Sequence, residues 1–164
     1  MSTTNNYLVT TTGGANFGGA MHRRIPCLVS EGAKLPHRQH TYDAGADLFS
    51  YLENSKPLTI MPGKQELVDT GVAVKIPQGY VGLVYNRSSQ GKKGIVIPHS
   101  VGVIDSEYRG TIKVLLKNTS DQPYMLNHWE RIAQLVVQPI ELVEFYDTWN
   151  DTQRGTGGFG STGS

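Results

Sequence analysis

The chain has 164 residues, enough for one domain with a buried core. Its 15 Lys and Arg residues are nearly balanced by 14 Asp and Glu residues, and the formal net charge of +1 argues against general binding of nucleic acids or membranes. The one cysteine, Cys27, excludes an intrachain disulfide and a cysteine-rich zinc site, and no apolar run reaches membrane-spanning length. We therefore expect a cytoplasmic, intracellular protein with many turns.

Residues 1–20 contain no charged side chain and no periodic apolar pattern, so we expect a flexible polar extension. From residue 24 onward, short runs rich in Val and Ile alternate with Gly, Pro, Asn and Asp. These runs occupy 56–61, 71–76, 80–85, 94–97, 101–104, 111–116 and 132–140. Runs of this length and composition predict β-strands. The sequence therefore predicts an all-β sandwich or barrel with at most one short helix.

The segment ERIAQLVVQPIELVEF allows two interpretations. Its length suits an amphipathic helix, but Pro139 interrupts it and β-branched residues fill it. We therefore expect two strands separated by a break at Pro139.

The segment GVIDSEYRGTIKVLL has the pattern of a β-hairpin whose turn is DSEYRG. Asp105 then lies at the end of the incoming strand, and Tyr108 follows three residues later across the turn. Asp105 could stabilise the turn while Tyr108 covers the edge of the core. Alternatively, the carboxylate could orient and deprotonate a water molecule beside an aromatic ring. The local sequence leaves both interpretations open.

Two further segments contain groups suited to phosphate binding. In NRSSQGKKG, Arg87 could bind phosphate oxygens in a bidentate manner while Ser88 and Ser89 donate hydrogen bonds, or the segment could be a solvated turn. In ERIAQL, Gln134 lies among apolar strand residues, where it either pairs locally or contacts a ligand.

Asp47, in AGADLFS, is either a turn or strand-end residue or a carboxylate near a hydrated cation. The chain has no dense group of His, Asp and Glu, so a metal site formed wholly by protein is not expected. Mg²⁺ brought in by substrate phosphates, with one or two protein carboxylates beyond its water shell, fits better.

The segment RGTGGFGSTG near the C-terminus also has two interpretations. Its glycines suit a flexible tail. Glycine amides with hydroxyls and an arginine also suit phosphate binding.

Five segments resemble, in sequence order, the five motifs of the trimeric dUTP diphosphatases (dUTPases): AGADLFS, RSSQGKKG, GVIDSEYRG, ERIAQL and RGTGGFGSTG. Five motifs in the family's order make the resemblance specific. It implies an all-β, jelly-roll-like core over 21–148, a mobile C-terminal lid over 149–164, and a homotrimer whose active sites are shared between chains. It also implies Mg²⁺-dependent conversion of dUTP and water to dUMP and pyrophosphate, which keeps uracil out of DNA and supplies dUMP for dTMP synthesis.

The resemblance implies a role for each motif. By position, Asp105 resembles the residue that activates water for in-line attack on the α-phosphorus. Tyr108 resembles the ring that packs under the deoxyribose and leaves no room for a 2′-hydroxyl. The backbone from His99 to Ile104 would bind the edge of uracil and exclude a 5-methyl group. Asp47 resembles a carboxylate that contacts Mg²⁺ through water.

The remaining positions carried over from the family are expected to bind substrate. In the core these are Gly102, Val103, Lys113 and the phosphate ligands Arg87, Ser88, Ser89 and Gln134. In the lid, Phe159 would stack on uracil. The γ-phosphate would be held by Arg154, Gly158, Gly160, Ser161 and Thr162. The lid would be mobile when empty and would close over a neighbouring subunit when nucleotide binds.

Two positions depart from the family pattern: Trp129 stands where a glycine is common, and His99 where Asn or Gly is frequent. A dCTP deaminase shares the fold, but Leu115 occupies the position of its glutamate and Tyr108 that of its usual phenylalanine. The other alternative is a non-catalytic trimer whose lid closure is recognised by a regulatory protein, as in some phage and viral relatives. We therefore expect as partners dUTP, the homotrimer and, for a phage or viral protein, such a regulator, with no direct contact with nucleic acid or membrane.

Overall fold

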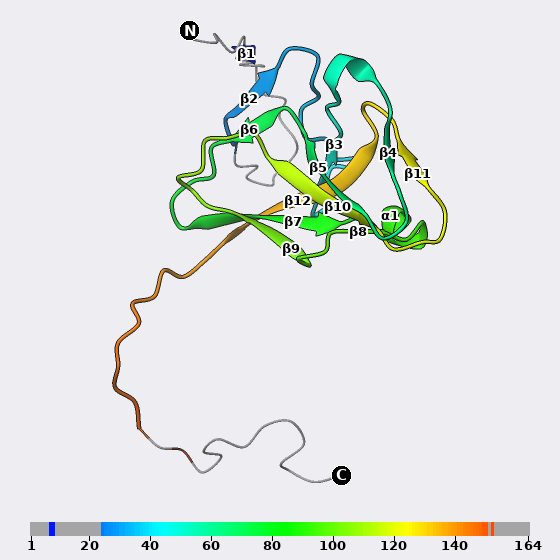
Figure 1. Cartoon of the computed structure of the whole chain (residues 1–164). Coiled ribbons are helices and arrows are strands. Elements are labelled where there is room, and N and C mark those ends of the chain that lie inside the picture. Colours follow the sequence, from blue (N-terminus) through cyan, green and yellow to red (C-terminus); the bar gives the residue numbers. More distant parts are fainter. Residues whose placement is uncertain (1–6, 9–23, 151, 153–164) are drawn as a thin grey trace, which may run out of the picture.

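The computed structural model describes residues 7–8, 24–150 and 152 of the chain. Figure 1 shows that nearly all regular structure in these residues is β. The strands are β1 (Tyr7–Leu8), β2 (Cys27–Ser30), β3 (Ala46–Phe49), β4 (Leu58–Ile60), β5 (Gln65–Asp69), β6 (Val72–Val74), β7 (Tyr80–Asn86), β8 (Ile95–Val96), β9 (Val101–Ile104), β10 (Lys113–Asn118), β11 (Tyr124–Leu126) and β12 (Arg131–Pro139). The helical elements are a short 3-10 turn, η1 (Glu53–Ser55), and one helix, α1 (Ser88–Lys92). The predicted all-β class is confirmed.

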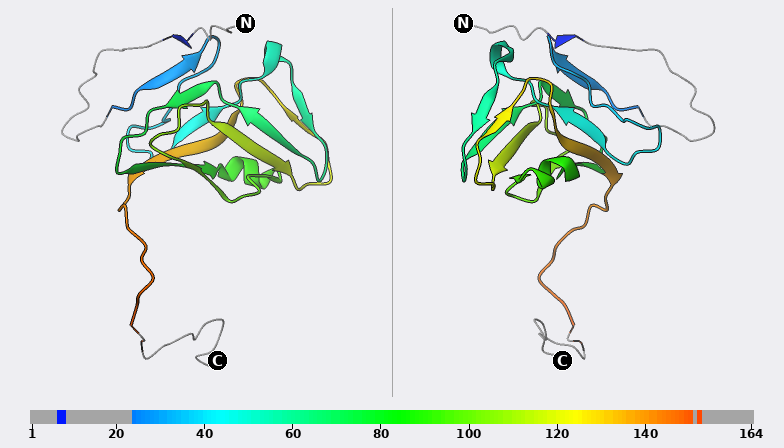
Figure 2. Two further views of the ribbon diagram at one scale, coloured as in Figure 1. Left: turned by 60° about the vertical axis from the view of Figure 1, so that its left-hand side comes forward. Right: turned by 90° about the vertical axis from the view of Figure 1, so that its right-hand side faces the viewer.

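The strand pairs among the described residues are antiparallel and form four sheets. The largest sheet contains β3, β12, β7 and β9 in that order. β5, β10 and β8 form a second sheet, β1, β2 and β6 a third, and β11 and β4 a ribbon. In both views of Figure 2 the sheets curl around one interior. Neighbouring strands come from distant parts of the chain, as expected for a jelly-roll-like arrangement.

The interior is filled by alternate residues of the strands. In β10, Val114 and Leu116 are buried, whereas Lys113 is exposed and Leu115 is only half-buried. This alternation follows from the two-residue period of a strand. Other fully buried side chains are Leu48, Ile60, Ile95, Ile112, Leu126 and Ile132. Burying each such side chain stabilises the fold by about 1.5–3 kcal/mol.

The hairpin predicted for GVIDSEYRGTIKVLL is wrong. β9 pairs with β7, whereas β10 pairs with β5 and β8 in another sheet. Only the turn is present, with the Tyr108 N–H donating to the Asp105 carbonyl at 3.1 Å. After this turn, buried Ile112 donates its N–H to the Val72 carbonyl and accepts from the Thr70 N–H. These contacts direct the chain into the second sheet.

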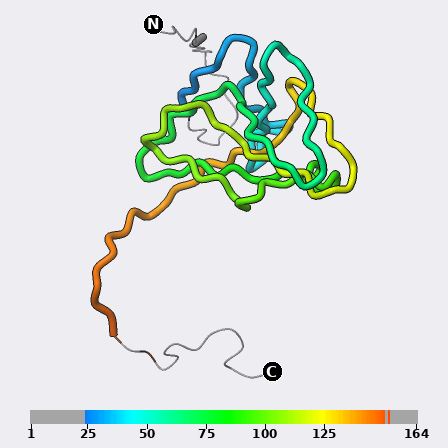
Figure 3. Tube along the Cα trace, viewed as in Figure 1, coloured from blue at the N-terminus to red at the C-terminus, as the bar shows by residue number. Residues whose placement is uncertain are grey.

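The prediction of two strands around Pro139 is also wrong, because the sheet ends there. β12 runs through Pro139, and a proline without an N–H is tolerated at the end of a strand. The Ile140 N–H still donates to the Gly79 carbonyl at 2.9 Å, but residues 141–150 contain no strand or helix. Figure 3 shows this segment leading away from the body. Its apolar side chains Leu142, Phe145 and Trp149 are 78%, 92% and 93% exposed.

The segment NRSSQGKKG, expected to be a loop or turn, forms α1 over most of its length. Five residues are too few for an isolated helix to be stable. Contacts with the rest of the fold must therefore hold α1 in place.

The predicted polar extension falls largely outside the described residues. Its described part, β1, pairs with β2, with Tyr7 opposite Ser30 and Leu8 opposite Val29. Within the described chain, we find no helix that is long and apolar enough to cross a membrane.

Candidate active site

Two arginines share one nearly buried carboxylate at an end of the largest sheet. Arg87 Nε lies 2.7 Å from Asp47 Oδ1, and Arg131 Nη1 lies 3.3 Å from Asp47 Oδ2. Arg87 Nη1 also donates to Ser89 Oγ at 3.1 Å. We call Asp47, Arg87, Ser89 and Arg131 the arginine cluster. Because two guanidinium charges surround one carboxylate, the cluster is positive overall and suited to binding anions.

The register of the largest sheet brings Gln134 to the arginine cluster. In β12, Gln134 lies opposite Asp47 of β3 on one side and opposite Tyr85 of β7 on the other. Arg87 follows Tyr85 by two residues. A Cβ at Gly45 would lie 2.8 Å from Gln134 Oε1, so glycine permits this close approach. The structure thus brings together the predicted residues Asp47, Arg87, Ser89 and Gln134, with Ser88 beside them at the start of α1.

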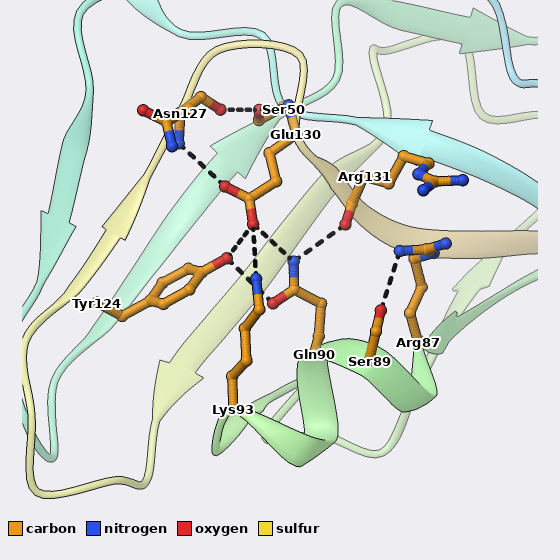
Figure 4. Close-up of polar contacts among 9 residues, drawn as sticks. All are labelled: Ser50, Arg87, Ser89, Gln90, Lys93, Tyr124, Asn127, Glu130 and Arg131. Atoms are coloured by element: carbon orange, nitrogen blue, oxygen red, sulfur yellow. Dashed lines mark hydrogen bonds and ion pairs between the residues drawn. The ribbon is translucent and has the colours of Figure 1, made fainter.

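Behind the arginine cluster, a polar network joins α1 to β12 (Figure 4). Gln90 is 2% exposed, and its Nε2 donates to the Arg131 carbonyl at 3.0 Å and to Glu130 Oε1 at 3.3 Å. Tyr124 Oη donates to Glu130 Oε1 and lies 3.1 Å from Gln90 Oε1. Lys93 Nζ lies 3.4 Å from Glu130 Oε1. This network was not predicted from the sequence, although Gln90 and Glu130 lie within two of the motifs.

Burial and hydrogen bonds shift the pKa values of two groups in this network. Burial raises the pKa of the Tyr124 phenol, and its hydrogen bond to Glu130 raises it further. Burial alone would raise the pKa of Glu130, but hydrogen bonds from Tyr124, the Asn127 N–H and Gln90, with the nearby Lys93 charge, lower it overall. Tyr124 therefore stays a donor and Glu130 a charged acceptor near neutral pH.

The turn over residues 105–110, which we call the Asp105 turn, follows β9. Asp105 itself is exposed. Tyr108 Oη donates to the Thr111 carbonyl at 2.9 Å, and a Cβ at Gly110 would lie 2.5 Å from the same Oη. Arg109 Nη1 donates to two carbonyls of the turn, at 2.7 and 2.9 Å. The position of the tyrosine ring therefore depends on the glycine and on the bonded turn.

β9 is an edge strand of the largest sheet in the described chain, because it pairs there only with β7. Gly102, Val103 and Ile104, all predicted to contact substrate, thus have one backbone edge without a strand partner. The turn before β9 contains His99, whose Nδ1 lies 3.1 Å from the Val101 carbonyl oxygen. Backbone groups suited to recognising a planar base are therefore available beside the Asp105 turn.

The arginine cluster and the Asp105 turn lie at opposite ends of β7. Tyr85 of β7 is opposite Val101, and Gly82 is opposite Ile104. Arg87 follows Tyr85 by two residues, and Asp105 follows Ile104 directly. About six residues of strand, at about 3.3 Å each, therefore separate the two groups by roughly 20 Å. One chain does not bring them together.

The other predicted residues lie elsewhere. Lys113 begins β10, opposite Asp69 and in a different sheet from β9. The predicted lid residues Arg154, Gly158, Phe159, Gly160, Ser161 and Thr162 lie outside the described part of the chain. Within that part, we find no group of three or more His, Cys, Asp or Glu residues that could hold a metal ion.

A comparison with known proteins identifies the family of this chain. The sequence model of the dUTPase family matches residues 31–163. This chain belongs to the dUTPase family. The deoxyuridine 5′-triphosphate nucleotidohydrolase of Corynebacterium diphtheriae is 48% identical over 133 residues, which cover 79% of this chain and 85% of that protein.

Solved dUTPase structures confirm the predicted jelly-roll-like dUTPase fold. A variant dUTPase of Staphylococcus aureus phage phi11, described with a structural Mg(II) ion, is 31% identical with a TM-score of 0.68, covering 78% of this chain and 98% of that one. A variant dUTPase of Staphylococcus bacteriophage 80alpha with dUpNHpp is 29% identical with a TM-score of 0.69, covering 79% and 98%. The phage dUTPases of that study are described as controlling the transfer of virulence genes.

Trp129 stands where the family resemblance predicts a glycine, and its backbone conformation is one that suits glycine. Its φ is +63°, in the left-handed region that glycine adopts without strain. Trp129 Nε1 donates to the Gly32 carbonyl at 2.8 Å, and Lys34 Nζ lies 4.3 Å from the centroid of its ring. The ring of His128 lies 4.9 Å away, centroid to centroid. These contacts offset the strain, and the turn before β12 is kept.

Proposed function

We propose that this chain hydrolyses dUTP to dUMP and pyrophosphate, and so keeps uracil out of DNA and supplies dUMP for dTMP synthesis. The observation that carries the proposal is the meeting of Asp47, Arg87 and Gln134 from three distant dUTPase motifs at one end of a sheet. The C. diphtheriae relative, named deoxyuridine 5′-triphosphate nucleotidohydrolase, supports the same reaction.

Arg87 would supply the most directed contacts to the triphosphate. Asp47 holds its Nε and Ser89 accepts from its Nη1, so the planar guanidinium is oriented before substrate binds. The hydroxyls of Ser88 and Ser89 and the amide of Gln134 add neutral donors for phosphate oxygens. Donors held in this way stabilise charge that develops on the phosphoryl group with little reorganisation.

β9 and Tyr108 would select the nucleoside. The backbone from His99 to Ile104 would hydrogen-bond the edge of uracil, and a strand held against the ring leaves no space for a 5-methyl group. Because this recognition uses the main chain, His99 in place of Asn or Gly changes little. The ring of Tyr108, positioned over Gly110, would pack under the deoxyribose and exclude a 2′-hydroxyl.

Asp105 would act as the general base. Its exposed carboxylate would take a proton from the attacking water while the water oxygen bonds to the α-phosphorus. The bond from the α-phosphorus to the bridging oxygen breaks, and pyrophosphate leaves. The Asp105→Asn variant should therefore keep nucleotide binding and lose most turnover, and unchanged turnover would remove Asp105 from this role.

Two observations support a homotrimer with shared active sites. Asp105 and Arg87 are roughly 20 Å apart along β7, so one chain does not place both at the same phosphorus. The outer face of the largest sheet also carries exposed apolar side chains: Val103 is 61% exposed, Tyr85 is 38% exposed, and Leu83 beside them is half-buried. Exposed apolar faces of this kind mark contacts with another chain.

We further propose Mg²⁺ as the cofactor; the phage phi11 relative is described with a structural Mg(II) ion. The described residues fit an ion that arrives with the phosphates, because both oxygens of Asp47 already face arginines. Asp47 would contact such an ion only through water. An ion bound in this way would neutralise phosphate charge.

The C-terminal lid remains a proposal from the dUTPase motifs, because residues 153–164, which include its predicted binding residues, lie outside the described chain. Deletion of residues 154–164 should greatly lower kcat while the trimer stays folded, and a fully active truncation would contradict the lid. Phe159→Ala should weaken closure through lost stacking, so a normal rate would show that Phe159 does not stack on the base.

The experiment that tests the proposed function is pyrophosphate release from dUTP, dCTP, dTTP and UTP with Mg²⁺, with Asp105→Asn as the control. Release from dUTP alone, lost in the variant, would support it. Release of ammonia from dCTP would indicate a deaminase. Leu115 argues against that activity, because it occupies the position of the deaminase glutamate and lies opposite Leu67. Tight dUTP binding without turnover would indicate a binding protein with a regulatory partner, the second role suggested by the phage 80alpha relative.

A further inference from the structure

The polar network behind the arginine cluster starts from Gln90, the third residue of α1. Its side chain points away from solvent, toward the start of β12 (Figure 4). The Arg131 carbonyl and Glu130 Oε1 accept from its Nε2, and its Oε1 faces the Tyr124 hydroxyl. Both hydrogens of the buried Gln90 amide therefore have acceptors, and its oxygen lies 3.1 Å from the Tyr124 hydroxyl.

Glu130 links Gln90 to the turn before β12. Its Oε2 accepts from the Asn127 N–H at 3.2 Å, and its own N–H donates to Ser50 Oγ at 2.9 Å. The Tyr124 hydroxyl has a single hydrogen, so the charged Glu130 carboxylate is its stronger acceptor. The network thus fastens α1 to a turn that is itself anchored to the core.

The same two segments are joined a second time on the outer side of the sheet. There Asp47 binds Arg87, which directly precedes α1, and Arg131, the first residue of β12. Buried ionic networks can often be replaced by well-packed apolar side chains without loss of stability, so stability alone does not account for the inner network. Unlike apolar packing, directional hydrogen bonds on two sides fix the rotation of the one-turn helix α1 relative to β12.

We propose that Gln90, Glu130 and Tyr124 are positioning residues for the triphosphate: they hold α1 against β12 so that Arg87 and Ser89 present their donors together. This inference rests on the proposed dUTP hydrolysis. The three residues act through the arginine cluster, not by contact with substrate. Their removal should therefore weaken binding of phosphates and leave binding of the nucleoside unchanged.

The test compares two ligands, dUpNHpp and deoxyuridine, on Gln90→Met and Tyr124→Phe. Gln90→Met removes every polar contact of this side chain at similar volume, so the Kd for dUpNHpp should rise about tenfold. Tyr124→Phe leaves Glu130 with its other donors, so the rise should be about threefold. The Kd for deoxyuridine should not change in either variant, and KM for dUTP should rise in the same order as the Kd for dUpNHpp.

Tyr51→Phe is the matched control, since it removes a hydroxyl that donates to the Glu31 carbonyl at 2.9 Å in the loop after β2. A purely structural role would lower the melting temperature without changing the ratio of the two dissociation constants. If Gln90→Met does not fold, Tyr124→Phe alone decides the question. An unchanged ratio in the folded variants, or an equal change in Tyr51→Phe, overturns the proposal. A wild-type chain that does not hydrolyse dUTP would instead refute the proposed function.

Discussion

Two inactive variants of this chain should restore activity to each other when they assemble into one trimer. One variant, Asp105→Asn, removes the general base. The other, Arg87→Gln, removes the central phosphate ligand and leaves Asp47 with Arg131 as its ion-pair partner. Because roughly 20 Å of β7 separates the two positions, an active site would take each residue from a different chain.

The size of the recovery follows from this geometry. In a cyclic trimer, each site takes Asp105 from one chain and Arg87 from the next chain. A trimer that contains both variants therefore has one site with both residues intact, whichever variant is in the majority. Purified mixed trimers should therefore have about one third of the wild-type activity. If each site used both residues of one chain, no site would be intact.

The assay needs trimers of known composition. The two variants are co-expressed with different affinity tags, and trimers that bind both resins are collected and checked by native mass spectrometry. Pyrophosphate release from dUTP is then measured per chain, with each variant alone as the control. Confirmed mixed trimers that are no more active than the separate variants would refute the shared site.

Three further predictions concern the Asp105 turn, the turn before β12 and the polar network. Gly110→Ala should displace the Tyr108 ring and lower kcat/KM for dUTP roughly 10- to 100-fold with little change in melting temperature; a normal kcat/KM would show that the ring position is unimportant. Urea denaturation should show Trp129→Gly to be more stable than Trp129→Ala by about 1 kcal/mol. Both variants lose the indole contacts, but only glycine adopts the positive φ at this position without strain. Equal stability of the two variants would contradict this. Burial raises the pKa of Tyr124, so its stabilising contribution is fully present below its ordinary pKa of about 10 and declines above it. The difference in unfolding free energy between wild type and Tyr124→Phe should therefore be smaller at about pH 10.5 than at about pH 8. An equal difference at the two pH values would contradict this prediction.

Local sequence patterns were enough to place β7, β9 and β10, because runs rich in Val and Ile are bounded there by turn residues. They did not predict which strands pair. The hairpin prediction failed because buried Ile112 bonds to Thr70 and Val72, which lie 42 and 40 residues earlier in the chain, and no local signal reports this. The strand ending at Pro139 was predicted, but the strand expected after it is absent among the described residues because no sheet neighbour is available there.

In the candidate site, too, single motifs could be predicted from the sequence, whereas their contacts could not. The motifs identified Asp47, Arg87 and Gln134, but only the sheet order explains how an aspartate meets an arginine 40 residues away. The network of Gln90 and Glu130 likewise joins residues 40 positions apart, and neither position suggests the other from sequence. Trp129 departs from the family pattern, and no local signal predicts that its indole bonds to the Gly32 carbonyl, 97 residues away in the chain.

Hydrolysis of dUTP in water that carries the heavy oxygen isotope tests most directly whether water attacks the α-phosphorus. We predict that the label appears in dUMP and not in pyrophosphate, because the water activated by Asp105 attacks the α-phosphorus. The same reaction with Asp105→Asn should release almost no product. Label in pyrophosphate, or a normal rate in the variant, would contradict the account.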